Sequence, residues 1–423
     1  MLRAGHIVIA AALALLMLGV VMVNSAGMEV AKTHVTVEGV LLSKSTIYMG
    51  IALATMAAVS WLTPVRLIAQ PPAFALPRST DSAWGGWNLK VMWALVFLML
   101  AVLALVYLPG LGDARKGSHR WIKLGLSDLT LQPSEFAKWF LVGLVAWYSV
   151  VMSRKVGNLF NGLLPILAAV GIVAGFVAIE DLGTAILLFC VSVVTILAAG
   201  AKLWHFLLPL PAVIAGGIAM VKLEPYRMAR ITAFLDPYAA PRTSGYHMIQ
   251  SQVAIANGEI AGRGLGNGLQ KFGYLPEDTT DFIFAIICEE LGLIGAVLVV
   301  SLFCTLILAG LAVVIKQRTT QAKVIALGIT ATVGIQAVIN LFVVVGWGPT
   351  KGIALPLLSS GGTGWILTAA ALGVLVALDR HASTDDLPDA DPATAAAAQA
   401  QPKPLSVTTT SAPLAAATQP ASA

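Results

Sequence analysis

Charged residues are scarce in this chain, and their scarcity excludes most soluble folds. Lys, Arg, Asp and Glu together make up 11% of the 423 residues, whereas hydrophobic residues make up 58%. A soluble domain carries about 25% charged residues. The apolar residues also come in blocks of about 20, the length of helix that crosses a hydrocarbon core. The composition therefore predicts a polytopic α-helical membrane protein.

Other absences narrow the possibilities further. Short segments of alternating polarity are missing, which excludes a membrane β-barrel. The three cysteines lie in apolar surroundings without CxxC spacing, so they indicate neither a disulfide framework nor a metal site. The six histidines are scattered and form no HExxH motif. We therefore expect no metal centre built from these residue types.

Ten apolar runs have the length of membrane spans. They cover residues 7–23, 46–63, 89–108, 135–152, 161–178, 182–200, 203–221, 291–315, 324–345 and 363–378. The first run starts like a signal peptide but is too long for one, so we expect a retained span. The acid-bearing segment 281–290 would make the eighth span too long, and it is expected to lie at the interface or to re-enter. The predicted fold is all-α, with about ten transmembrane helices and a long extracytoplasmic loop between helices 7 and 8.

Basic loops suggest which side of the membrane each end occupies. An even number of spans places both termini on one side. The short loops with Arg154-Lys155, with Lys202 and with 316–323 carry only basic charges, which favours a cytoplasmic location for them and for the termini. The opposite face also holds many basic residues, so counting alone does not settle orientation, and that excess suggests an anionic ligand outside. We predict a transmembrane domain over 1–380 and a disordered Ala/Pro/Ser/Thr-rich cytoplasmic tail over 381–423.

Acidic and basic residues gather near the predicted outer ends of the helices. Glu135 and Lys138 share a helix face at the mouth of the fourth span, where they form either a structural ion pair or part of a substrate pathway. Arg120 stands beside Trp121, a pairing typical of an interfacial anchor. Asp181 precedes the sixth span, and helix capping and a substrate role are equally open there.

Two loops on the same face carry further candidates. Arg227 and Arg230 are three residues apart and could bracket a pyrophosphate, or simply form a solvated face. Five glycines between Gly258 and Gly268 could cradle a phosphate with their N–H groups, or form turns. The Gly- and Pro-rich loop 345–364 either lines a cavity, which Lys351 and Ser360 would face, or is a tight hairpin.

These motifs occur together in a recognisable order. They include "LQPSEFAK", "DLGTA", "RITAFLDP", "GYHMIQSQVAIANGEIAGRGLGNGLQK", "YLPEDTTDFIFAIICEELGLIG" and "GPTKGIALPLLSSGG". The chain from its first span to about residue 380 resembles the SEDS family of shape, elongation, division and sporulation proteins (FtsW, RodA, SpoVE). The stretches "GLQKFGYLPE" and "CEELGLIG" look closer to the division branch than to the elongation branch.

The resemblance implies a function and places it on residues. It implies a peptidoglycan glycosyltransferase of the bacterial cytoplasmic membrane, with an outward active site that polymerises lipid II into glycan strands. The expected partners are a class B penicillin-binding protein, other division or elongation proteins and membrane lipids, with no nucleic acid. The catalytic Asp of the family falls on Asp281, its functional Glu and Lys fall on Glu135 and Lys138, and the Asp of the DLGTA motif falls on Asp181.

The chain also departs from the family pattern. Thr279 replaces the usual His before the catalytic motif, and Glu180 replaces the usual Pro before DLGTA. In the SSGGTG stretch, Ser360 replaces Tyr and Gly364 replaces Ser. The effect of these changes on a division or elongation role is an open question, whereas retention of Asp281, Glu135 and Lys138 favours an active enzyme.

Elementary chemistry agrees with this reading. Inverting transfer from a sugar diphosphate needs a base for the acceptor hydroxyl and positive charge for the departing pyrophosphate. We assign Asp281 as the base and the arginines 120, 227 and 230 to the pyrophosphate, with Lys138 tuning the base or binding a phosphate. No cofactor is required, although an acid-rich site permits a divalent cation. A lipid II flippase or transporter, and a non-catalytic scaffold for a transpeptidase, are the alternatives.

Overall fold

The computed structural model describes residues 3–28, 37–64, 82–115, 118–123, 130–152, 156–360 and 362–382. These residues all belong to one compact unit, Met1–Ser383. Except for its first two residues, the predicted tail over 381–423 lies outside the described residues, as do the predicted cytoplasmic residues Arg154 and Lys155.

Helices account for every predicted span. Each of the ten apolar runs overlaps one or two of the following: α1 (Ala4–Ala26), α3 (Lys44–Leu62), α5 (Ser82–Ala104), α6 (Pro133–Val151), α7 (Leu164–Glu180), α8 (Leu182–Ala198), α9 (Trp204–Leu207), α10 (Leu210–Lys222), α13 (Ile283–Lys316), α14 (Thr320–Val344) and α15 (Thr363–Ala382). Within the described part, seven helices are long and apolar enough to cross a membrane. The helices α8 and α10 are apolar but shorter, and α6 carries two charged residues in its first turns. The prediction of a polytopic all-α membrane protein is confirmed.

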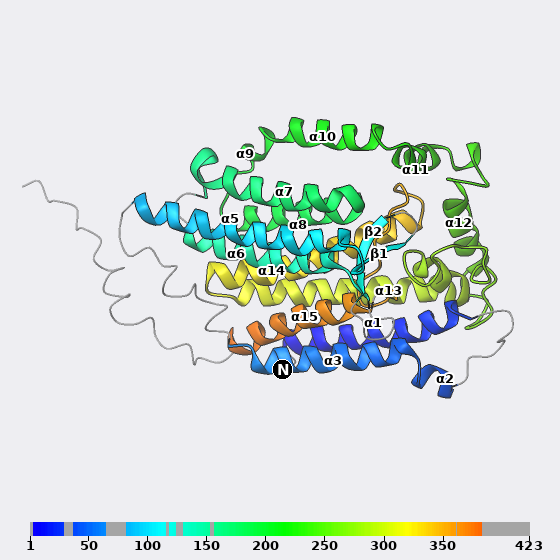
Figure 1. Cartoon of the computed structure of the whole chain (residues 1–423). Helices are drawn as coiled ribbons and strands as arrows, with labels where there is room; N and C mark the ends of the chain where they lie inside the picture. Colours follow the sequence, from blue (N-terminus) through cyan, green and yellow to red (C-terminus); the bar gives the residue numbers. More distant parts are fainter. Residues whose placement is uncertain are drawn as a thin grey trace, which may run out of the picture. The chain divides into compact units, whose positions relative to one another are not determined.

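The spans pack side by side around α14 (Figure 1). This helix contacts α6 and α8 on one side and α13 and α15 on another. One apolar core joins α1, α3, α13, α14 and α15, and a second joins α5, α6, α7 and α8. By contrast, α10 has no buried residue, and an apolar helix of that kind is suited to a lipid environment. Side chains on α14 are therefore the best placed to link the two halves of the bundle.

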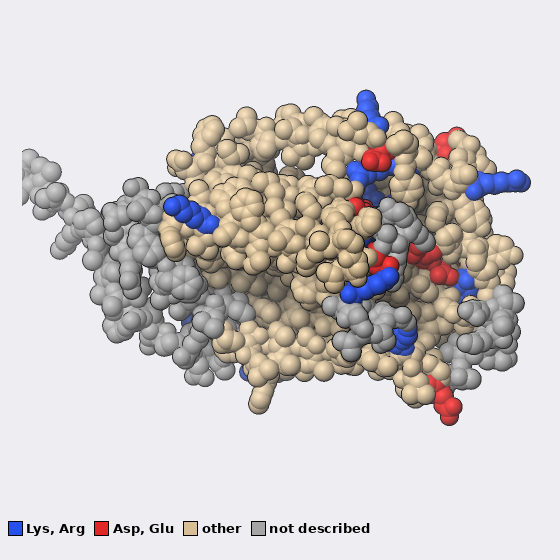
Figure 2. All heavy atoms as spheres, viewed as in Figure 1, with Lys and Arg blue, Asp and Glu red and all other residues tan. Residues whose placement is uncertain are grey.

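The start of α1 and the end of α15 lie at the same end of the bundle. The backbone N–H of Gly5 donates to the Asp379 carboxylate at 2.8 Å, and Lys316 pairs with the same carboxylate at 3.0 Å. The opposite end, called here the site end, carries α11 (Pro225–Leu235), a 3-10 turn (Pro237–Ala239), α12 (Tyr246–Gly258) and the loops around them (Figure 1). In the space-filling view, most of the visible acidic and basic side chains gather toward this end (Figure 2).

A small antiparallel sheet at the site end was not predicted from the sequence. It consists of β1 (Gly112–Arg115), β2 (Ser118–Lys123) and β3 (Thr130–Leu131), with Ile122 paired to Gly112 on one side and to Leu131 on the other. A 3-10 turn, Leu105–Tyr107, precedes the sheet. Its backbone passes so close to Gly112 that a Cβ on this residue would lie 1.9 Å from the Val106 carbonyl oxygen. Glycine is required at that crossing. Arg120 lies on β2 of this sheet, whereas the sequence around Arg120 and Trp121 predicts an interfacial anchor.

The segment 283–290, expected to lie at the interface or to re-enter, is shielded by the rest of the protein. It forms the first part of α13 and is buried within the protein, so it is not a lipid-exposed interfacial helix. The helix breaks at Gly292, whose φ of 63° and ψ of −158° are not helical. The N–H groups of Arg263 and Gly264 donate to the Glu289 and Glu290 carbonyls that the break leaves free. These two hydrogen bonds pair carbonyl groups that the break would otherwise leave without partners. They explain how the protein accommodates a 34-residue helix with an interruption.

Candidate functional site

Asp281 lies in the turn that leads into α13, at the site end. Its side chain is partly exposed, whereas Phe282 and the residues after it are buried. Burial raises the pKa of Asp281 to about 7, and the carboxylates of Glu277 and Asp181 act in the same direction. Arg120 and Arg230 act in the opposite direction. The pKa of this carboxyl group therefore lies near neutral pH, which is the range that suits general acid–base chemistry.

Arg120 stands at the centre of the charged groups. A Cβ placed on Gly352 would lie 3.2 Å from one terminal nitrogen of Arg120 and 3.4 Å from the Asp281 carboxylate, so both side chains face the same piece of backbone. The same Arg120 nitrogen lies 3.7 Å from the Asp181 carboxylate. Its Nε and other terminal nitrogen donate to the carbonyl oxygen of Glu180, at 3.1 and 2.6 Å. The sequence prediction that Arg120 belongs to the site agrees with this geometry.

Asp181 caps the helix that follows it and also lies near the other charged groups of the site. Its carboxylate accepts the backbone N–H of Thr184 at 3.0 Å and the Thr184 hydroxyl at 2.9 Å, which caps the N-terminus of α8. The carboxylate also approaches Arg120 and influences the titration of Asp281. The capping interpretation is confirmed, and the buried acid contributes to the electrostatics of the site as well.

Arg227 and Arg230 lie on α11 but have different partners. Arg227 donates to the carbonyl oxygens of Ala178 and Ile179, at 2.9 and 2.7 Å, and so completes hydrogen bonds at the end of α7. Arg230 donates to the Thr350 carbonyl at 3.1 Å and lies close enough to Asp281 to lower its pKa. The structure thus brings Arg230 to the site, while Arg227 is committed to helix ends beside it.

The loop between α14 and α15 also reaches the site. Lys351 is partly buried, which lowers its pKa, and the Asp181 carboxylate opposes that decrease. The backbone N–H of Ser360 donates to the Thr279 carbonyl at 2.9 Å, while the Ser360 side chain is exposed. Two of the positions that depart from the family pattern, Thr279 and Ser360, therefore touch each other next to Asp281.

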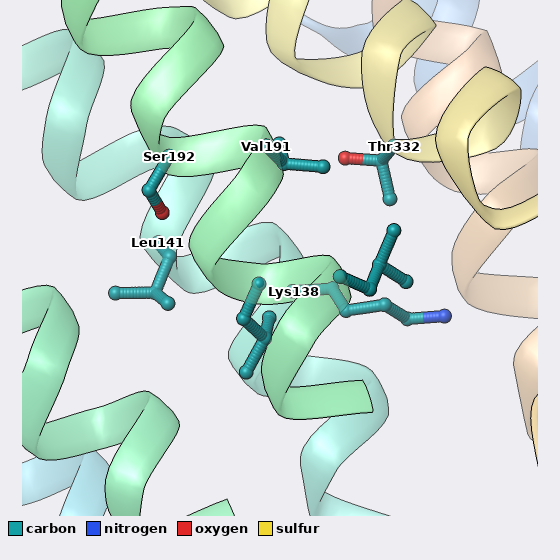
Figure 3. Close-up of a pocket in the computed structure, with 7 residues that line it drawn as sticks. Lys138, Leu141, Val191, Ser192 and Thr332 are labelled. Atoms are coloured by element: carbon teal, nitrogen blue, oxygen red, sulfur yellow. The ribbon is translucent and has the colours of Figure 1, made fainter. Parts of the chain in front are cut away.

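Glu135 and Lys138 form the expected ion pair in the first turns of α6. Lys138 Nζ lies 2.8 Å from the Glu135 carboxylate, and Lys138 is almost completely buried. Lys138 also borders a narrow cavity between α6, α8 and α14 that has no room for a water molecule, and its Nζ points away from Leu141 and Ser192 (Figure 3). A Cβ on Gly364 would lie 3.4 Å from the Glu135 carboxylate, so this third departure from the family pattern leaves a gap beside the pair.

The backbone N–H groups of the glycine-rich loop are already bonded to carboxylates of the protein. The backbone N–H groups of Gly266 and Gly268 donate to the Glu290 carboxylate at 3.0 and 3.3 Å, and those of Leu269 and Gln270 donate to the Glu289 carboxylate at 3.0 and 3.1 Å. These four donors are occupied and are not free to cradle a phosphate. The carboxylates of the protein fill a backbone concavity of the type that binds anions.

The structure adds partners for Glu180 and two residues, Gln336 and Asn340, that sequence reasoning missed. The Glu180 carboxylate accepts the Tyr107 hydroxyl and the His119 N–H, both at 2.9 Å, and so holds the sheet against α7. Gln336 and Asn340 on α14 bond to Lys138 and to the Asp281 carbonyl, respectively. Two amides one helical turn apart in an apolar span were the available signal, because buried polar groups need partners.

Nothing in the described residues resembles a metal centre. No group of three or more His, Cys, Asp or Glu side chains there is close enough together to hold an ion. Asp181, one of the acids near Asp281, lies beside Arg120 and Lys351, and Arg120 and Arg230 place positive charge near Asp281 itself.

Comparison with known proteins identifies relatives over almost the whole chain. The family described as "Cell cycle protein" (FtsW, RodA and SpoVE) matches residues 6–384. The chain is 37% identical over 375 residues to the probable peptidoglycan glycosyltransferase FtsW of Nitrosococcus halophilus, which covers 87% of this chain and 90% of that relative. It is 38% identical over 302 residues to the stage V sporulation protein E of Bacillus subtilis, which covers 70% of this chain and 80% of that relative.

Solved structures show the same fold. A chain of a peptidoglycan synthase complex that coordinates polymerization and crosslinking has a TM-score of 0.66 and 25% identity, with 89% of this chain and 98% of that chain covered. The rod shape determining protein RodA of Thermus thermophilus has a TM-score of 0.56 and 22% identity, with 89% and 97% covered. This chain belongs to the FtsW/RodA/SpoVE family, and the resemblance to SEDS proteins is confirmed.

Proposed function

We propose that this multi-pass membrane protein is a peptidoglycan glycosyltransferase that polymerises lipid II into glycan strands during cell division. Its relatives named FtsW carry the name of that activity at 34–38% identity over most of the chain. FtsW-named relatives are the basis for favouring division over RodA-like elongation. The structural observation that carries the proposal is Asp281, a partly exposed carboxyl group whose pKa is raised to about 7 and which lies near Arg120 and Arg230.

Asp281 supplies the base in this mechanism. Its carboxylate accepts the proton of the acceptor sugar 4-hydroxyl as that oxygen attacks the anomeric carbon of the donor. The bond from that carbon to the pyrophosphate oxygen breaks, its electron pair leaves with the pyrophosphate, and the α-linked donor becomes a β-linked product. A carboxyl group with a pKa near the working pH is well matched to this proton transfer.

Positive side chains near Asp281 stabilise the departing pyrophosphate. Arg120 and Arg230 flank Asp281, and Lys351 approaches Asp181. Preorganised cations in a poorly hydrated site stabilise developing charge far better than water does. Arg227 contributes less directly, since its guanidinium is bonded to carbonyls at the end of α7. Lys138, paired with Glu135, positions the neighbouring groups, and Ser360 borders the acceptor side through its contact with Thr279.

The site end is assigned to the outer face of the cytoplasmic membrane, with both termini inside. The shared end of α1 and α15 supports a common side for the termini, and the basic loops at Lys202 and 316–323 favour the cytoplasm for it. Undecaprenyl chains would then lie in the bilayer between helices while the sugars meet at the outer interface. We also propose a class B penicillin-binding protein as partner, in keeping with the synthase complex of similar fold.

A polymerisation assay with purified protein tests this function. The chain, with its transpeptidase partner, is given labelled lipid II in detergent, and products are resolved on a gel. Wild type is expected to form polymer, and Asp281→Asn is expected to lose activity by about 10²–10⁴-fold. Asp236→Asn is the matched control, because Asp236 is an exposed acid that caps a 3-10 turn and is not among the groups that shift the pKa of Asp281.

The same assay separates the alternatives. A flippase or a scaffold makes no polymer in detergent, where there are no two sides of a membrane to cross. Absence of polymer from wild type with its partner would refute the glycosyltransferase. Near-normal polymer from Asp281→Asn would leave the activity standing and remove Asp281 as its base.

A further inference from the structure

Two amide side chains stand one turn apart on the same face of α14. Gln336 is 7% exposed and Asn340 is 2% exposed, inside an otherwise apolar helix. Burying an amide costs free energy unless its hydrogen bonds are replaced. The partners of these two side chains therefore indicate what the amides do.

Asn340 bridges two loops that converge at the site. Its Nδ2 donates to the Asp281 carbonyl at 2.8 Å and to the Ile353 carbonyl at 2.8 Å. Both partners only accept hydrogen bonds, so the nitrogen rather than the oxygen of the amide must face them. One side chain thus joins the turn before α13 to the segment before α15, 59 and 13 residues away in sequence.

Gln336 links the same segment before α15 to Lys138 on α6. Its Oε1 accepts from Lys138 Nζ at 2.9 Å, and its Nε2 donates to the Ala354 carbonyl at 2.8 Å. Ala354 directly follows the Asn340 partner Ile353. The backbone at 353–354 therefore lies between the buried ion pair of α6 and the proposed base, held at two consecutive carbonyls by one helix.

We propose that Asn340 and Gln336 are positioning residues of the glycosyltransferase site, which set the placement of Asp281 relative to the Glu135–Lys138 pair. The helix that carries them packs against four other helices, α6, α8, α13 and α15, and is therefore held on several sides. Catalytic groups held from a rigid helix keep their geometry better than groups held only by loops. The inference rests on the proposed function for its kinetic consequence, while the tether itself can be measured without activity.

A purely structural role predicts a different outcome from a positioning role. If the amides only satisfy buried carbonyls, their loss lowers the melting temperature and the yield of folded enzyme. It would leave the turnover number of the folded fraction, and the pH dependence, as in wild type. If they position Asp281, their loss changes turnover and the acidic limb of the pH–rate profile.

The decisive variant is Asn340→Leu, which keeps the number and branching of the side-chain heavy atoms and removes both donors. We expect kcat for lipid II to fall about 10–100-fold with KM changed less than about threefold, as a displacement of a catalytic group near 1 Å produces. The acidic limb should move to lower pH, because a loosened Asp281 is better hydrated. Hydrogen–deuterium exchange should rise in peptides covering 279–283 and 351–356 and stay unchanged elsewhere.

Further variants distinguish a positioning role from a general effect on the fold. Thr330→Val, on the same helix, removes a buried hydroxyl that bonds only to its own helix at Ala326, and it should leave kcat, the pH profile and exchange as in wild type. Gln336→Met should reduce kcat less than Asn340→Leu, since Lys138 keeps its bond to Glu135. If Asn340→Leu does not fold, Asn340→Gln retains the amide but displaces its nitrogen by one methylene, and it should show the same changes in weaker form.

Each outcome decides the inference. A folded Asn340 variant with wild-type kcat, pH profile and exchange overturns it, even though polymerisation by the wild type would still support the proposed function. Increased exchange at both loops in a protein whose wild type makes no polymer would retain the tether and reject the glycosyltransferase. Lower melting temperature with unchanged kcat and pH profile would reduce both amides to a structural role.

Discussion

Asp281 and the Glu289–Glu290 pair lie within ten residues of each other and have opposite surroundings. Asp281 is partly exposed, and its pKa is raised to about 7 because burial and nearby carboxylates disfavour its charge. Glu289 and Glu290 are fully buried. Their carboxylates accept four backbone N–H groups, and Glu290 also binds the Ser25 hydroxyl and Lys271, the latter at 2.7 Å.

The comparison shows how the proposed base, Asp281, differs from the two buried glutamates in its hydrogen-bond partners. Complete hydrogen bonding makes a buried carboxylate a stable part of the fold, since both its charge and its oxygens are satisfied. Incomplete pairing leaves a carboxyl group poised to exchange a proton. Burial alone does not distinguish them, because the more buried acids are the inert ones.

The largest expected effect is on stability, at Glu290. Glu290→Gln removes the partner of Lys271 and turns an amide donor toward groups that already donate, so an unpaired buried charge remains. We expect a loss of about 3–5 kcal/mol, seen as a lower melting temperature of the detergent-purified protein by intrinsic fluorescence. Glu259→Gln, which changes an exposed acid at the C-terminal end of α12, is the control. An unchanged melting temperature for Glu290→Gln would contradict the structural assignment.

The opposite change in stability is expected at Asp281. Its folded pKa is about 7, above the ordinary value of 3.8, so folding favours the protonated form. The cost of holding the carboxylate grows as pH rises from the ordinary range through about 7 and is complete above it. Asp281→Asn removes that cost and should stabilise the protein by about 2 kcal/mol at pH 8, after allowance for partial exposure. A lower melting temperature at pH 8 would count against the raised pKa.

The pH dependence of activity tests the contrast between Asp281 and the Glu289–Glu290 pair in a second way. A base with a pKa of about 7 is mostly ionised at pH 8 and mostly protonated at pH 6. The initial rate of lipid II polymerisation should therefore fall about tenfold between pH 8 and pH 6, while the fold held by Glu289 and Glu290 stays intact. Rates and melting temperatures measured on the same samples test this. An acidic limb near pH 4 would instead indicate an unperturbed carboxyl group.

The smallest effect is expected at Glu180, whose partners lie on the protein surface. Glu180→Ala removes the acceptor of the Tyr107 hydroxyl and of the His119 N–H, while the backbone carbonyl that binds Arg120 remains. Exposed bonds of this kind contribute about 1 kcal/mol or less, so kcat/KM should fall no more than about fivefold. Glu224→Ala, an exposed acid before α11, is the control for a lost surface charge. A loss as large as that of Asp281→Asn would make Glu180 part of the chemistry.

Much of the architecture could be read from the sequence. The spans followed from apolar runs of membrane length, and helix start signals placed Glu135 and Asp181 near helix ends, where the structure has them. The sheet was missed because its strands have two to six residues and no clear alternation. The role of Glu289 and Glu290 was also missed, since a position beside a span suggests a solvated boundary and gives no sign of a loop that folds back over it.

The sequence by itself determined that the chain is a bundle of membrane helices with its charged motifs at one end, because hydropathy and helix-terminus preferences act over a few neighbouring residues. Only the tertiary structure decided which charges are satisfied and which remain available. Glu290 meets Ser25 across 265 residues, and Lys138 meets Gln336 across 198. Hydrogen bonding and desolvation depend on groups brought together by packing, and therefore a reactive carboxyl group can be told from a structural one only after the helices are in place.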